Sequence, residues 1–443
     1  MKLRGEMFMD KMKDSGIKWI GTIPEHWEVE EISKLFTQRN TKVSDFDFPP
    51  LSVTKKGIVP QLESAAKSDD HTNRKLVKKD DFVINSRSDR KMSSGVSEFD
   101  GSVSLINLVM IPKQEKLSVP FVKYLLKNYG FAEEFYRWGT GIVDDLWSTN
   151  WERGKKIQLP IPPISEQQRI AKFLDEKTAL IDEIISDSKK SIEELKAYKQ
   201  SLITEIVTKG LDPNVTLVPS GIDWIGDIPE GWEVVRSKNI LSYSKGLSIT
   251  KENLTETGIP VINYGQIHSK YPVYFNPRIN QLPFVSNVYL ESKKNALLNQ
   301  GDFVFADTSE DISGSGNFSS LTSDGIVFAG YHTIIARIID KTRINFRYLA
   351  YYFSSELHRK QVGSRVSGVK VFSISQKILK SMLILLPNRD EQDSIANYLD
   401  QKIAQIDAII AEKENLISEY ESYKKSIIYE YVTGKKQVEG YES

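Results

Sequence analysis

The stretch GIKWIGTIPEHWEV, residues 16–29, decides the fold because it occurs twice in the chain. Its second copy, GIDWIGDIPEGWEV, occupies residues 221–234, and 11 of the 14 positions are identical without any gap between the two copies. With about one chance in twenty of a match at each position, unrelated segments do not agree to this extent. The chain is therefore an internal duplication, and the repeat governs the whole fold.

A second pair of matching segments follows the two copies, at a constant but larger offset along the chain. The globular part between the two motifs is therefore about twenty residues longer in the second copy. The matching positions are Glu166, Gln167, Ile170, Ala171, Leu174, Asp175, Lys177, Ile181 and Asp182, which recur as Glu391, Gln392, Ile395, Ala396, Leu399, Asp400, Lys402, Ile406 and Asp407.

Both of these segments predict long helices, over residues 166–208 and 391–433. Apolar residues recur in steps of three and four, and no Gly or Pro lies inside. Pro163 or Pro387 precedes each helix, and Gly210 or Gly434 ends it. Two copies of one apolar stripe offer each other the same burial, so we predict an antiparallel coiled coil. A helix packed on its own module is the alternative. The stripe residues are Ile181, Ile185, Ile192, Leu195, Leu202 and Ile206, and Ile406, Ile410, Ile417, Tyr420, Ile427 and Tyr431.

The globular modules are predicted to be mixed α/β, which makes the whole chain α+β. Buried strands are expected at 81–84 and 302–305, further strands at 51–54, 103–111, 260–264 and 326–339, and helices at 121–135 and 346–361. The predicted division is a first module over 1–160, a first helix over 161–210, a connector with the second module over 211–387, and a second helix with a tail over 388–443.

Composition limits the class of protein. The 443 residues include no cysteine, which excludes disulfides and thiolate metal sites and fits a reducing cytoplasm. No apolar run is long enough for a membrane span, and residues 1–14 are charged throughout, unlike a secretory leader. We therefore expect a cytoplasmic protein.

Charge is distributed unevenly although the net charge is zero. Residues 30–160 carry 21 Lys and Arg against 18 Asp and Glu, and residues 233–387 carry 18 against 11, whereas residues 391–433 carry 4 against 9. Local basic surface, more than global charge, determines affinity for phosphates. The modules are therefore the basic parts, and nucleic acid is a candidate partner.

No catalytic motif accompanies this pattern. The chain has no GxxxxGK[ST] phosphate loop, no GxSxG elbow and no Asn-Pro-Pro-aromatic methyltransferase signature. Its five histidines are not spaced as metal ligands. The Gly314–Gly316 pair lies in a serine-rich stretch that is typical of a flexible turn. The sequence therefore indicates a binding protein without a metal site or catalytic residues.

Polar and basic segments follow the predicted strands in both modules. Arg pairs with guanine edges, Asn and Gln pair with adenine, and Ser, Thr and Lys hold phosphates. Residues 138–151 form a further candidate segment near the end of the first module. The candidate DNA contacts are Thr54, Lys55, Lys56, Arg87, Arg90 and Lys91 in the first module, and Asn263, Tyr264, Gln266, Lys270, Ser309, Ser315, Asn317, Arg365 and Lys370 in the second.

The doubled GIxWIGxIPExWEV motif, with the helix start that contains Pro163, Glu166, Gln167, Ile170 and Ala171, resembles the specificity subunit of type I restriction–modification systems. The second helix start departs slightly, because Pro387 stands one residue further out. The resemblance covers the chain from about residue 15 to 434.

The resemblance implies two target-recognition domains that each read half of a bipartite sequence in double-stranded DNA, with the paired helices as a spacer. It also implies two methyltransferase subunits and, in a full complex, two restriction and translocation subunits as partners. S-adenosylmethionine, ATP and Mg²⁺ would then be used by the partners, with no cofactor in this chain. Two alternatives stay open: a coiled-coil scaffold whose modules bind protein, and an enzyme with an unrecognised site.

Overall fold

The computed structural model describes residues 11–63, 71–142, 147–366, 368 and 370–438. Residues 1–10, on which the expectation about a leader rests in part, and residues 143–146 of the 138–151 segment lie outside the described residues. The chain divides into two compact units, one of residues 1–189 with 414–443 and the other of residues 190–413. Each unit thus joins one module, the adjoining end of one long helix and the opposite end of the other. The sequence-based division, which is linear along the chain, does not coincide with these units.

The two long helices are α5 (Ile164–Lys209) and α11 (Arg389–Val432), within two residues of the predicted bounds. Each passes from one unit into the other. The glycine stop signals act as expected, since Gly210 and Gly434 have φ angles of 80° and 71°. A Cβ at residue 434 would also lie 2.3 Å from Pro24 Cδ, so only glycine fits there.

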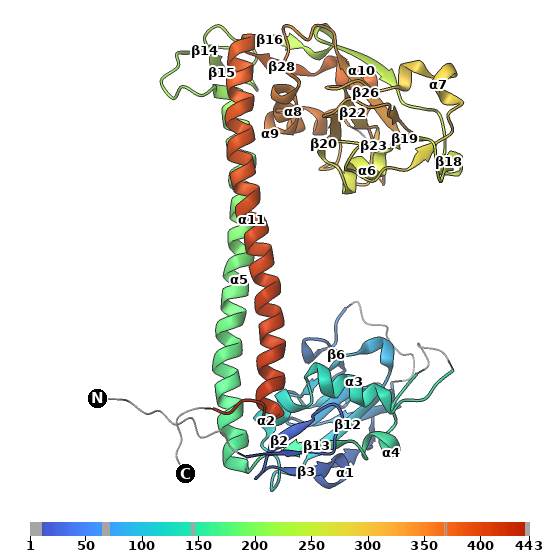
Figure 1. The fold of residues 1–443 in the computed structure, drawn as a ribbon, viewed down its shortest axis with the longest axis vertical. Coiled ribbons are helices and arrows are strands. Elements are labelled where there is room, and N and C mark those ends of the chain that lie inside the picture. Colours follow the sequence, from blue (N-terminus) through green and yellow to red (C-terminus); the bar gives the residue numbers. More distant parts are fainter. Residues whose placement is uncertain (1–10, 64–70, 143–146, 367, 369, 439–443) are drawn as a thin grey trace. The chain divides into compact units, whose positions relative to one another are not determined.

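The helices run antiparallel in each unit (Figure 1). In the first unit the rings of Phe173 and Tyr431 are 4.5 Å apart, and further along α5 the Asp182 carboxylate meets Lys424 Nζ at 2.6 Å. A higher number on α5 therefore meets a lower number on α11. In the second unit, Lys199 on α5 meets Asp407 on α11 at 2.6 Å. The predicted antiparallel coiled coil is confirmed.

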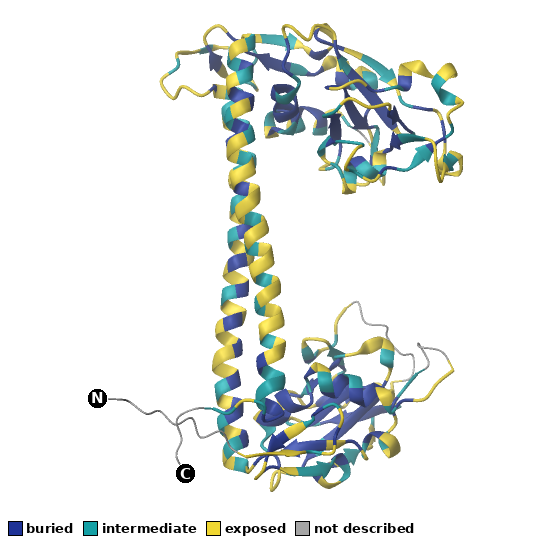
Figure 2. Cartoon of the chain, viewed as in Figure 1, coloured by how far each residue is buried: buried dark blue, intermediate teal, exposed yellow. Residues whose placement is uncertain are grey.

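The apolar stripe faces the partner helix, as the alternation of buried and exposed residues in Figure 2 shows. The ends of each helix also pack on a module: Leu202 and Val207 of α5 share a core with Trp232. Both packing modes that the sequence allowed are therefore present. Of the predicted stripe, the buried members are Ile181, Ile185, Ile192, Leu202, Ile406 and Ile427, and the half-buried ones are Leu195, Ile206, Ile410, Ile417, Tyr420 and Tyr431.

The first module is built on a four-stranded antiparallel sheet, β10-β9-β12-β4, and a three-stranded sheet, β11-β8-β5. The strand pairs β1-β2, β3-β13 and β6-β7 complete it. Its elements are β1 (Met12–Asp14), β2 (Thr22–Pro24), β3 (Glu28–Glu31), α1 (Ile32–Leu35), β4 (Phe36–Arg39), β5 (Lys42–Val43), β6 (Leu51–Thr54), β7 (Gly57–Pro60), β8 (Arg74–Val77), β9 (Phe82–Asn85), η1 (Ser88–Arg90), β10 (Ser94–Val96), β11 (Gly101–Val103), β12 (Asn107–Pro112), α2 (Val119–Leu125), α3 (Tyr129–Arg137), α4 (Trp151–Gly154) and β13 (Gln158–Ile161).

The second module has a five-stranded sheet, β17-β26-β22-β24-β20, and a four-stranded sheet, β18-β21-β19-β25, with three further strand pairs, β14-β15, β16-β28 and β23-β27. Its elements are β14 (Leu217–Pro219), β15 (Asp227–Pro229), β16 (Glu233–Arg236), η2 (Ser237–Asn239), β17 (Leu241–Lys245), η3 (Lys251–Asn253), β18 (Leu254–Thr255), β19 (Ile259–Ile262), α6 (Tyr264–Ser269), β20 (Val273–Phe275), β21 (Phe284–Val285), α7 (Tyr289–Ser292), η4 (Lys294–Ala296), β22 (Phe303–Ala306), β23 (Thr308–Ser309), β24 (Phe318–Leu321), β25 (Phe328–Ala329), β26 (Thr333–Ile338), α8 (Phe346–Ser354), α9 (Glu356–Gly363), β27 (Phe372–Ser373), α10 (Gln376–Ser381) and β28 (Leu383–Leu386).

The mixed α/β character of both modules is confirmed, and the elements are shorter than the apolar runs predicted. The run 103–111 is split into β11 and β12, and 326–339 into β25 and β26. Each of the two helices predicted inside the modules is divided into two shorter helices in the structure, because a capping side chain begins a new helix part-way along. Asn128 accepts a hydrogen bond from Phe131 N, and Ser355 accepts one from His358 N.

The repeated motifs form the joint between each module and its helix. Trp27 Nε1 donates to Glu166 Oε1 at 3.1 Å, and Trp232 Nε1 donates to Glu391 Oε1 at the same distance. The two segments that match in sequence thus touch each other in space. This contact explains why both were retained together in the two copies.

The glutamine beside each of these glutamates is fully buried and anchors the chain that enters the helix. Gln392 Nε2 donates to Pro387 O and Arg343 O, and its Oε1 accepts from Asn345 N. Gln167 makes the same set of three bonds, with Pro162 O, Lys116 O and Ser118 N. The bonds to Pro387 O, Asn345 N and Pro162 O are buried, and losing the partner of such a backbone group costs about 1–3 kcal/mol.

Candidate nucleic-acid interface

The β6–β7 hairpin of the first module carries two of the predicted contacts at its turn. Lys55 and Lys56 are exposed there. Thr54 is occupied by the turn itself, since its hydroxyl donates to Gly57 O at 2.9 Å and accepts from Lys56 N at 3.1 Å. The threonine therefore shapes the hairpin, and the two ammonium groups are the groups available to a phosphate.

The segment after β9 also projects basic side chains, but most of them are paired. Lys91 Nζ lies 2.9 Å from Glu133, and Arg90 Nε lies 3.4 Å from Asp89. Arg87 is exposed, and no ion pair to it is found among the described residues. Of the three cations predicted here, Arg87 is the one whose charge is not already offset.

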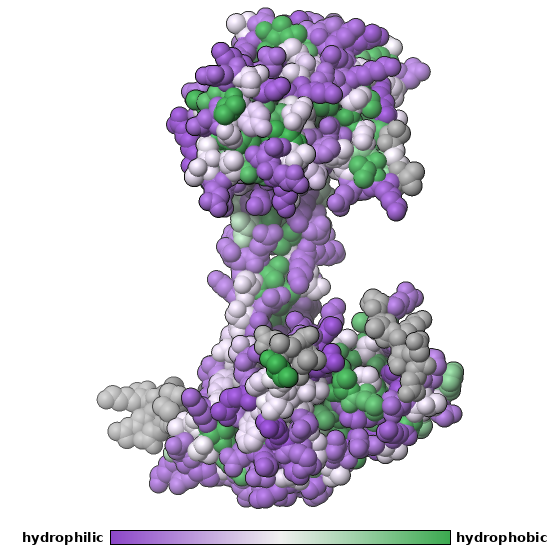
Figure 3. Space-filling model, turned by 90° about the vertical axis from the view of Figure 1, so that its right-hand side faces the viewer, coloured by the Kyte–Doolittle hydropathy of each residue, from purple (hydrophilic) through white to green (hydrophobic). Residues whose placement is uncertain are grey.

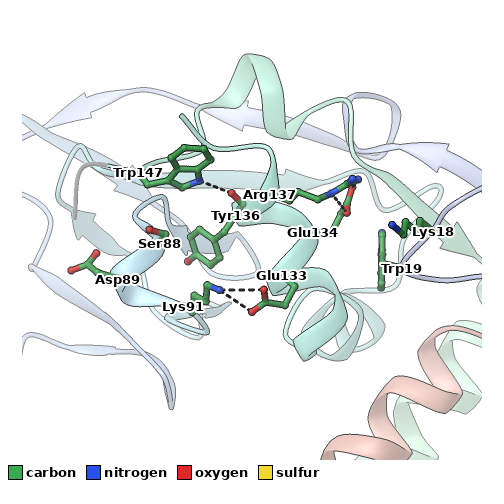
Figure 4. Close-up of a pocket in the computed structure, with 10 residues that line it drawn as sticks. All are labelled: Lys18, Trp19, Ser88, Asp89, Lys91, Glu133, Glu134, Tyr136, Arg137 and Trp147. Atoms are coloured by element: carbon green, nitrogen blue, oxygen red, sulfur yellow. Dashed lines mark hydrogen bonds and ion pairs between the residues drawn. The ribbon is translucent and has the colours of Figure 1, made fainter. Parts of the chain in front are cut away.

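Asp89, Lys91 and Glu133 border a pocket of about 850 Å³ (Figure 4). Hydrogen bonds hold two of its lining side chains in position: Tyr136 Oη donates to Asn85 O, and Trp147 Nε1 donates to Tyr136 O. Burial raises the pKa of Tyr136, so the phenol stays a donor. Positive and negative groups balance around the opening, which suits a polar ligand group better than a bare phosphate. The lining residues are Lys18, Trp19, Ser88, Asp89, Lys91, Glu133, Glu134, Tyr136, Arg137 and Trp147.

The second module differs from the expectation after β19, where the chain forms helix α6 and not a loop. Asn263 is 1% exposed and caps this helix, and its backbone N donates to Gln266 Oε1 at 3.0 Å. The Asn263 side-chain oxygen also accepts from Tyr331 N at 3.1 Å. Asn263 is therefore buried at the start of the helix with its side-chain oxygen already bonded, and Gln266 is half-buried in the same cap. Contact of these two residues with DNA stays a prediction. Lys270 is exposed directly after the helix.

A second pocket, of about 800 Å³, opens between α6 and the segment 307–319. A chain of hydrogen bonds forms its wall: Arg359 Nη2 donates to Asn317 Oδ1 at 2.8 Å, and the Asn317 amide meets His268 Nδ1 at 3.0 Å. His268 Nε2 in turn lies 2.8 Å from Thr308 O. Since a carbonyl only accepts, Nε2 carries the proton and Nδ1 is the acceptor.

Aromatic rings line the mouth of this pocket. Tyr264 is 36% exposed, and its ring lies edge-on to those of His268, Tyr331 and His332 at centroid distances of 5.4–6.2 Å. Exposed rings beside positioned amide and carboxylate groups can contact both the face and the edge of a nucleobase. Two predicted contacts in this region, Ser309 and Ser315, are buried, and their contact with DNA stays a prediction.

Three residues that line this pocket, Tyr264, Ser309 and Asn317, were predicted from the sequence, whereas His268, His332 and Arg359 were not. His268 could have been found, since it lies one helical turn after Tyr264 on α6. Arg359 and His332 come from distant segments and carry no signal in the sequence pattern. The remaining predicted contacts, Arg365 and Lys370, are exposed on the segment after α9.

The described part of the chain lacks two further features. No helix there is long and apolar enough to cross a membrane. No group of three or more metal-ligating side chains is found there either. The face of the molecule drawn in Figure 3 is largely hydrophilic, with apolar side chains in small groups.

The fold is duplicated, with accessible polar and basic loops in both modules, and comparison with known proteins finds similar chains. Residues 229–419 match the family model for the type I restriction modification DNA specificity domain. The chain is 25% identical, over 94% of its length and 94% of the relative, to the type I restriction enzyme MjaVIII specificity subunit of Methanocaldococcus jannaschii.

Solved structures share the fold. A chain from a type I R-M system, described for its complex assembly and conformational transition, has a TM-score of 0.72 at 16% identity, over 94% of this chain and 99% of that one. The HsdS subunit from Thermoanaerobacter tengcongensis has a TM-score of 0.54 at 15% identity, over 94% and 98%. The chain is therefore similar over nearly its whole length to type I restriction enzyme specificity subunits, and residues 229–419 match the model of their DNA specificity domain.

Proposed function

We propose that the chain recognises a bipartite sequence in double-stranded DNA, one half with each module, and holds two methyltransferase subunits in place. The observation that carries the proposal is the pattern of what is repeated and what is not. The module–helix joints, Trp27–Glu166 and Trp232–Glu391, are the same in both copies. The exposed loops differ, as expected if each module reads a different half-sequence.

The helices offer equivalent surfaces to two copies of one partner. Tyr198 and Tyr423 occupy equivalent positions of the two repeated helices, one in each unit, and their side chains are 57% and 52% exposed. Large exposed aromatic side chains are frequent anchors of protein interfaces. We propose that each tyrosine contacts one methyltransferase subunit. In a full restriction complex, two restriction and translocation subunits would join the assembly.

The partners would then supply the chemistry. S-adenosylmethionine would be bound by the methyltransferase subunits, and ATP and Mg²⁺ would be used by the restriction subunits. The residues proposed for DNA in this chain are those that the structure leaves accessible, among them Lys55, Lys56, Arg87, Tyr264 and Lys270. Arg365 and Lys370 complete this set.

Methylation sequencing of cells that carry this gene with its methyltransferase gene tests the proposal. We expect one methylated motif made of two defined half-sequences with an undefined gap, lost when this gene is deleted. A motif without a gap, or methylation that persists after deletion, would refute the bipartite role. Purified chain that pulls down protein but shows no salt-dependent affinity for duplex DNA would favour the scaffold alternative.

Docking is tested separately with Tyr198→Ala and Tyr423→Ala. Each single variant should bind one methyltransferase subunit and the double variant none, measured as the mass of the purified complex. Leu180→Ala, at another exposed position of α5, is the matched control. Unchanged stoichiometry in the double variant would place the docking surface elsewhere.

A further inference from the structure

A strongly basic cleft lies in the second module, apart from the pocket beside α6. It has a volume of about 430 Å³ and is lined by five cationic side chains, Arg236, Lys238, Arg365, Lys377 and Lys380, together with Ser381 and Leu383. All five cations are exposed, no acidic residue lines the cleft, and none of the ion pairs found among the described residues involves them. Only Arg365 was predicted from the sequence as a DNA contact.

The backbone brings these side chains together. Arg236 ends β16 directly opposite Leu383, the first residue of β28. The backbone bond from Ser237 N to Met382 O, at 2.8 Å, fastens η2 to the end of α10. Lys238 on η2 and both lysines of α10 therefore open onto the same side. Like charges gathered this closely repel one another, and an anion that neutralises them relieves this repulsion.

The first module does not repeat the cleft, although it repeats the local backbone. The bond from Ser237 N to Met382 O has its counterpart in Ile32 N to Ile157 O, at 2.9 Å. The positions equivalent to the five cations, under the same two offsets that relate the repeated motifs, are Glu31, Ser33, Thr140, Glu152 and Lys155. In the first module, Lys155 is paired with Glu152.

This asymmetry identifies the kind of ligand. A partner present in two equivalent copies needs the same surface in both modules, and an acidic surface of such a partner would meet Glu31 and Glu152 in one of them. DNA needs no such equivalence, because each module meets a different half of the sequence. The cleft also shares a residue with the proposed DNA interface, because Arg365 is one of the proposed DNA contacts and lines the cleft.

We infer that this cleft binds the phosphate backbone of the DNA next to the half-sequence that the second module reads. The inference rests on the proposed DNA-binding function. Guanidinium and ammonium groups are the usual phosphate ligands, and such contacts position a protein without reading bases. The second module therefore makes more contacts with DNA phosphates than the first.

The test compares Lys377→Gln/Lys380→Gln with the unchanged chain, each assembled with its methyltransferase subunits. The matched control is Lys293→Gln/Lys294→Gln, two exposed lysines of the same module outside the cleft. The dissociation constant for mixed-sequence duplex DNA is measured from about 50 to 200 mM salt. We expect the slope of log Kd against log salt to fall by about two in the cleft variant, about one per lost phosphate contact. The slope of the control should not change.

Footprinting on duplex DNA that contains the methylated motif completes the test. In the cleft variant, backbone protection should be lost beside the second half-sequence and stay intact beside the first, with the methylated motif unchanged. A slope and footprint equal to those of the control would overturn the inference, and so would loss of methyltransferase binding with unchanged DNA affinity. A failure of the proposed function looks different, because the unchanged chain would itself show no salt-dependent DNA binding.

Discussion

Lys199 Nζ and Asp407 Oδ1 lie 2.6 Å apart, and Lys424 and Asp182, which occupy the equivalent positions of the repeat, make the same contact at the same distance. The duplication thus extends from the sequence to the contacts between the two helices. Because a lysine of each helix meets an aspartate of the other, the pairs fix both the antiparallel direction and the register. Parallel helices would not satisfy both at once.

The two ion pairs should contribute equally to stability. The side chains are 29–59% exposed, so each pair is expected to contribute about 0.2–1 kcal/mol. A double-mutant cycle with Lys199→Ala and Asp407→Ala, and a second with Lys424→Ala and Asp182→Ala, should give equal coupling energies in urea unfolding. Both couplings should fall at high salt. A coupling of opposite sign in one cycle would contradict this equivalence.

Gln392→Leu should destabilise the second unit strongly. The change removes three hydrogen bonds to backbone groups of Arg343, Asn345 and Pro387 and leaves the groups of Asn345 and Pro387 buried without a partner, so we expect a loss of about 2–4 kcal/mol. Urea unfolding measures the change. Gln401→Leu, an exposed position on the same helix, is the control and should change stability by less than about 0.5 kcal/mol. A cost no larger than that of the control would mean that water replaces the side chain.

The loop after β9 should contribute unequally to DNA binding. Arg87→Gln should lower the salt slope by about one, whereas Lys91→Gln should lower it less because Glu133 already holds that lysine. Neutralising Arg87, Arg90 and Lys91 together should weaken protection of one half-sequence and leave the other footprint intact. Lys172→Gln, on the exposed side of α5, is the control. Equal slopes for all variants would show that this loop only faces solvent.

His358 should make the second unit sensitive to acid. Burial lowers the pKa of this imidazole to about 3, from 6.5 in the unfolded chain, so the unfolded state binds the proton more readily. The neutral, buried imidazole therefore contributes fully to the free energy of unfolding above pH 6.5, and this contribution is lost as the pH falls from 6.5 towards 3. At pH 5.5 the loss should be about 1.4 kcal/mol, equivalent to a tenfold change in the unfolding constant.

His358→Phe removes this titration, and Phe suits the site because the imidazole ring lies 4.8 Å from that of Phe353. The variant should lose less stability than the unchanged chain between pH 7.5 and 5.5, measured by urea unfolding. His71→Gln, at an exposed position, is the control. The same pH dependence in the His358 variant and the unchanged chain would rule out this histidine as its source.

Helix length should set the gap between the two half-sequences. From the sequence alone, the natural place to lengthen α5 by four residues is between Val207 and Gly210. In the structure, however, Val207 is buried in the core of the second unit and the Gly210 position lies against Glu391. Insertions after Lys189 in α5 and after Lys413 in α11 avoid both cores, because the division between the units falls there. Both helices must be lengthened to keep the antiparallel register.

Four helical residues add about 6 Å and turn the chain by about 40° beyond a full circle. One to two base pairs of DNA add about 3.4–7 Å and turn in the same right-handed sense, so elastic adjustment can absorb the remainder. The variant with both insertions, assembled with its methyltransferase subunits, should therefore direct methylation to the same half-sequences with one or two more base pairs between them. Methylation of the original spacing at an undiminished rate would show that the helices do not set the distance.

Much of the architecture could be predicted from the repeat, because identical residues at a constant offset must occupy equivalent places. The helices, their glycine stops and their antiparallel pairing followed from that argument. The joint between Trp232 and Glu391 could not be seen in advance, since the sequence shows that both motifs recur but not that they touch.

The binding loops were harder to predict because a side chain that caps a helix looks the same in sequence as one that faces solvent. Asn263 was expected on the surface and is buried as a cap, whereas Tyr264 beside it is exposed. The basic cleft was not predicted from the sequence for a related reason. Arg236 and Lys380 are far apart in the chain, and only the pairing of β16 with β28 brings their segments together.

The first unit contains both ends of the described chain, and this has a consequence for synthesis on the ribosome. Ile170 and Leu174 share a core with Ile427 and Val432 of α11. At roughly 5–20 residues per second, more than ten seconds separate the translation of these segments. During that interval the start of α5 exposes apolar surface to chaperones and proteases. A chain that stops before residue 414 should therefore be degraded even though its first module is fully translated.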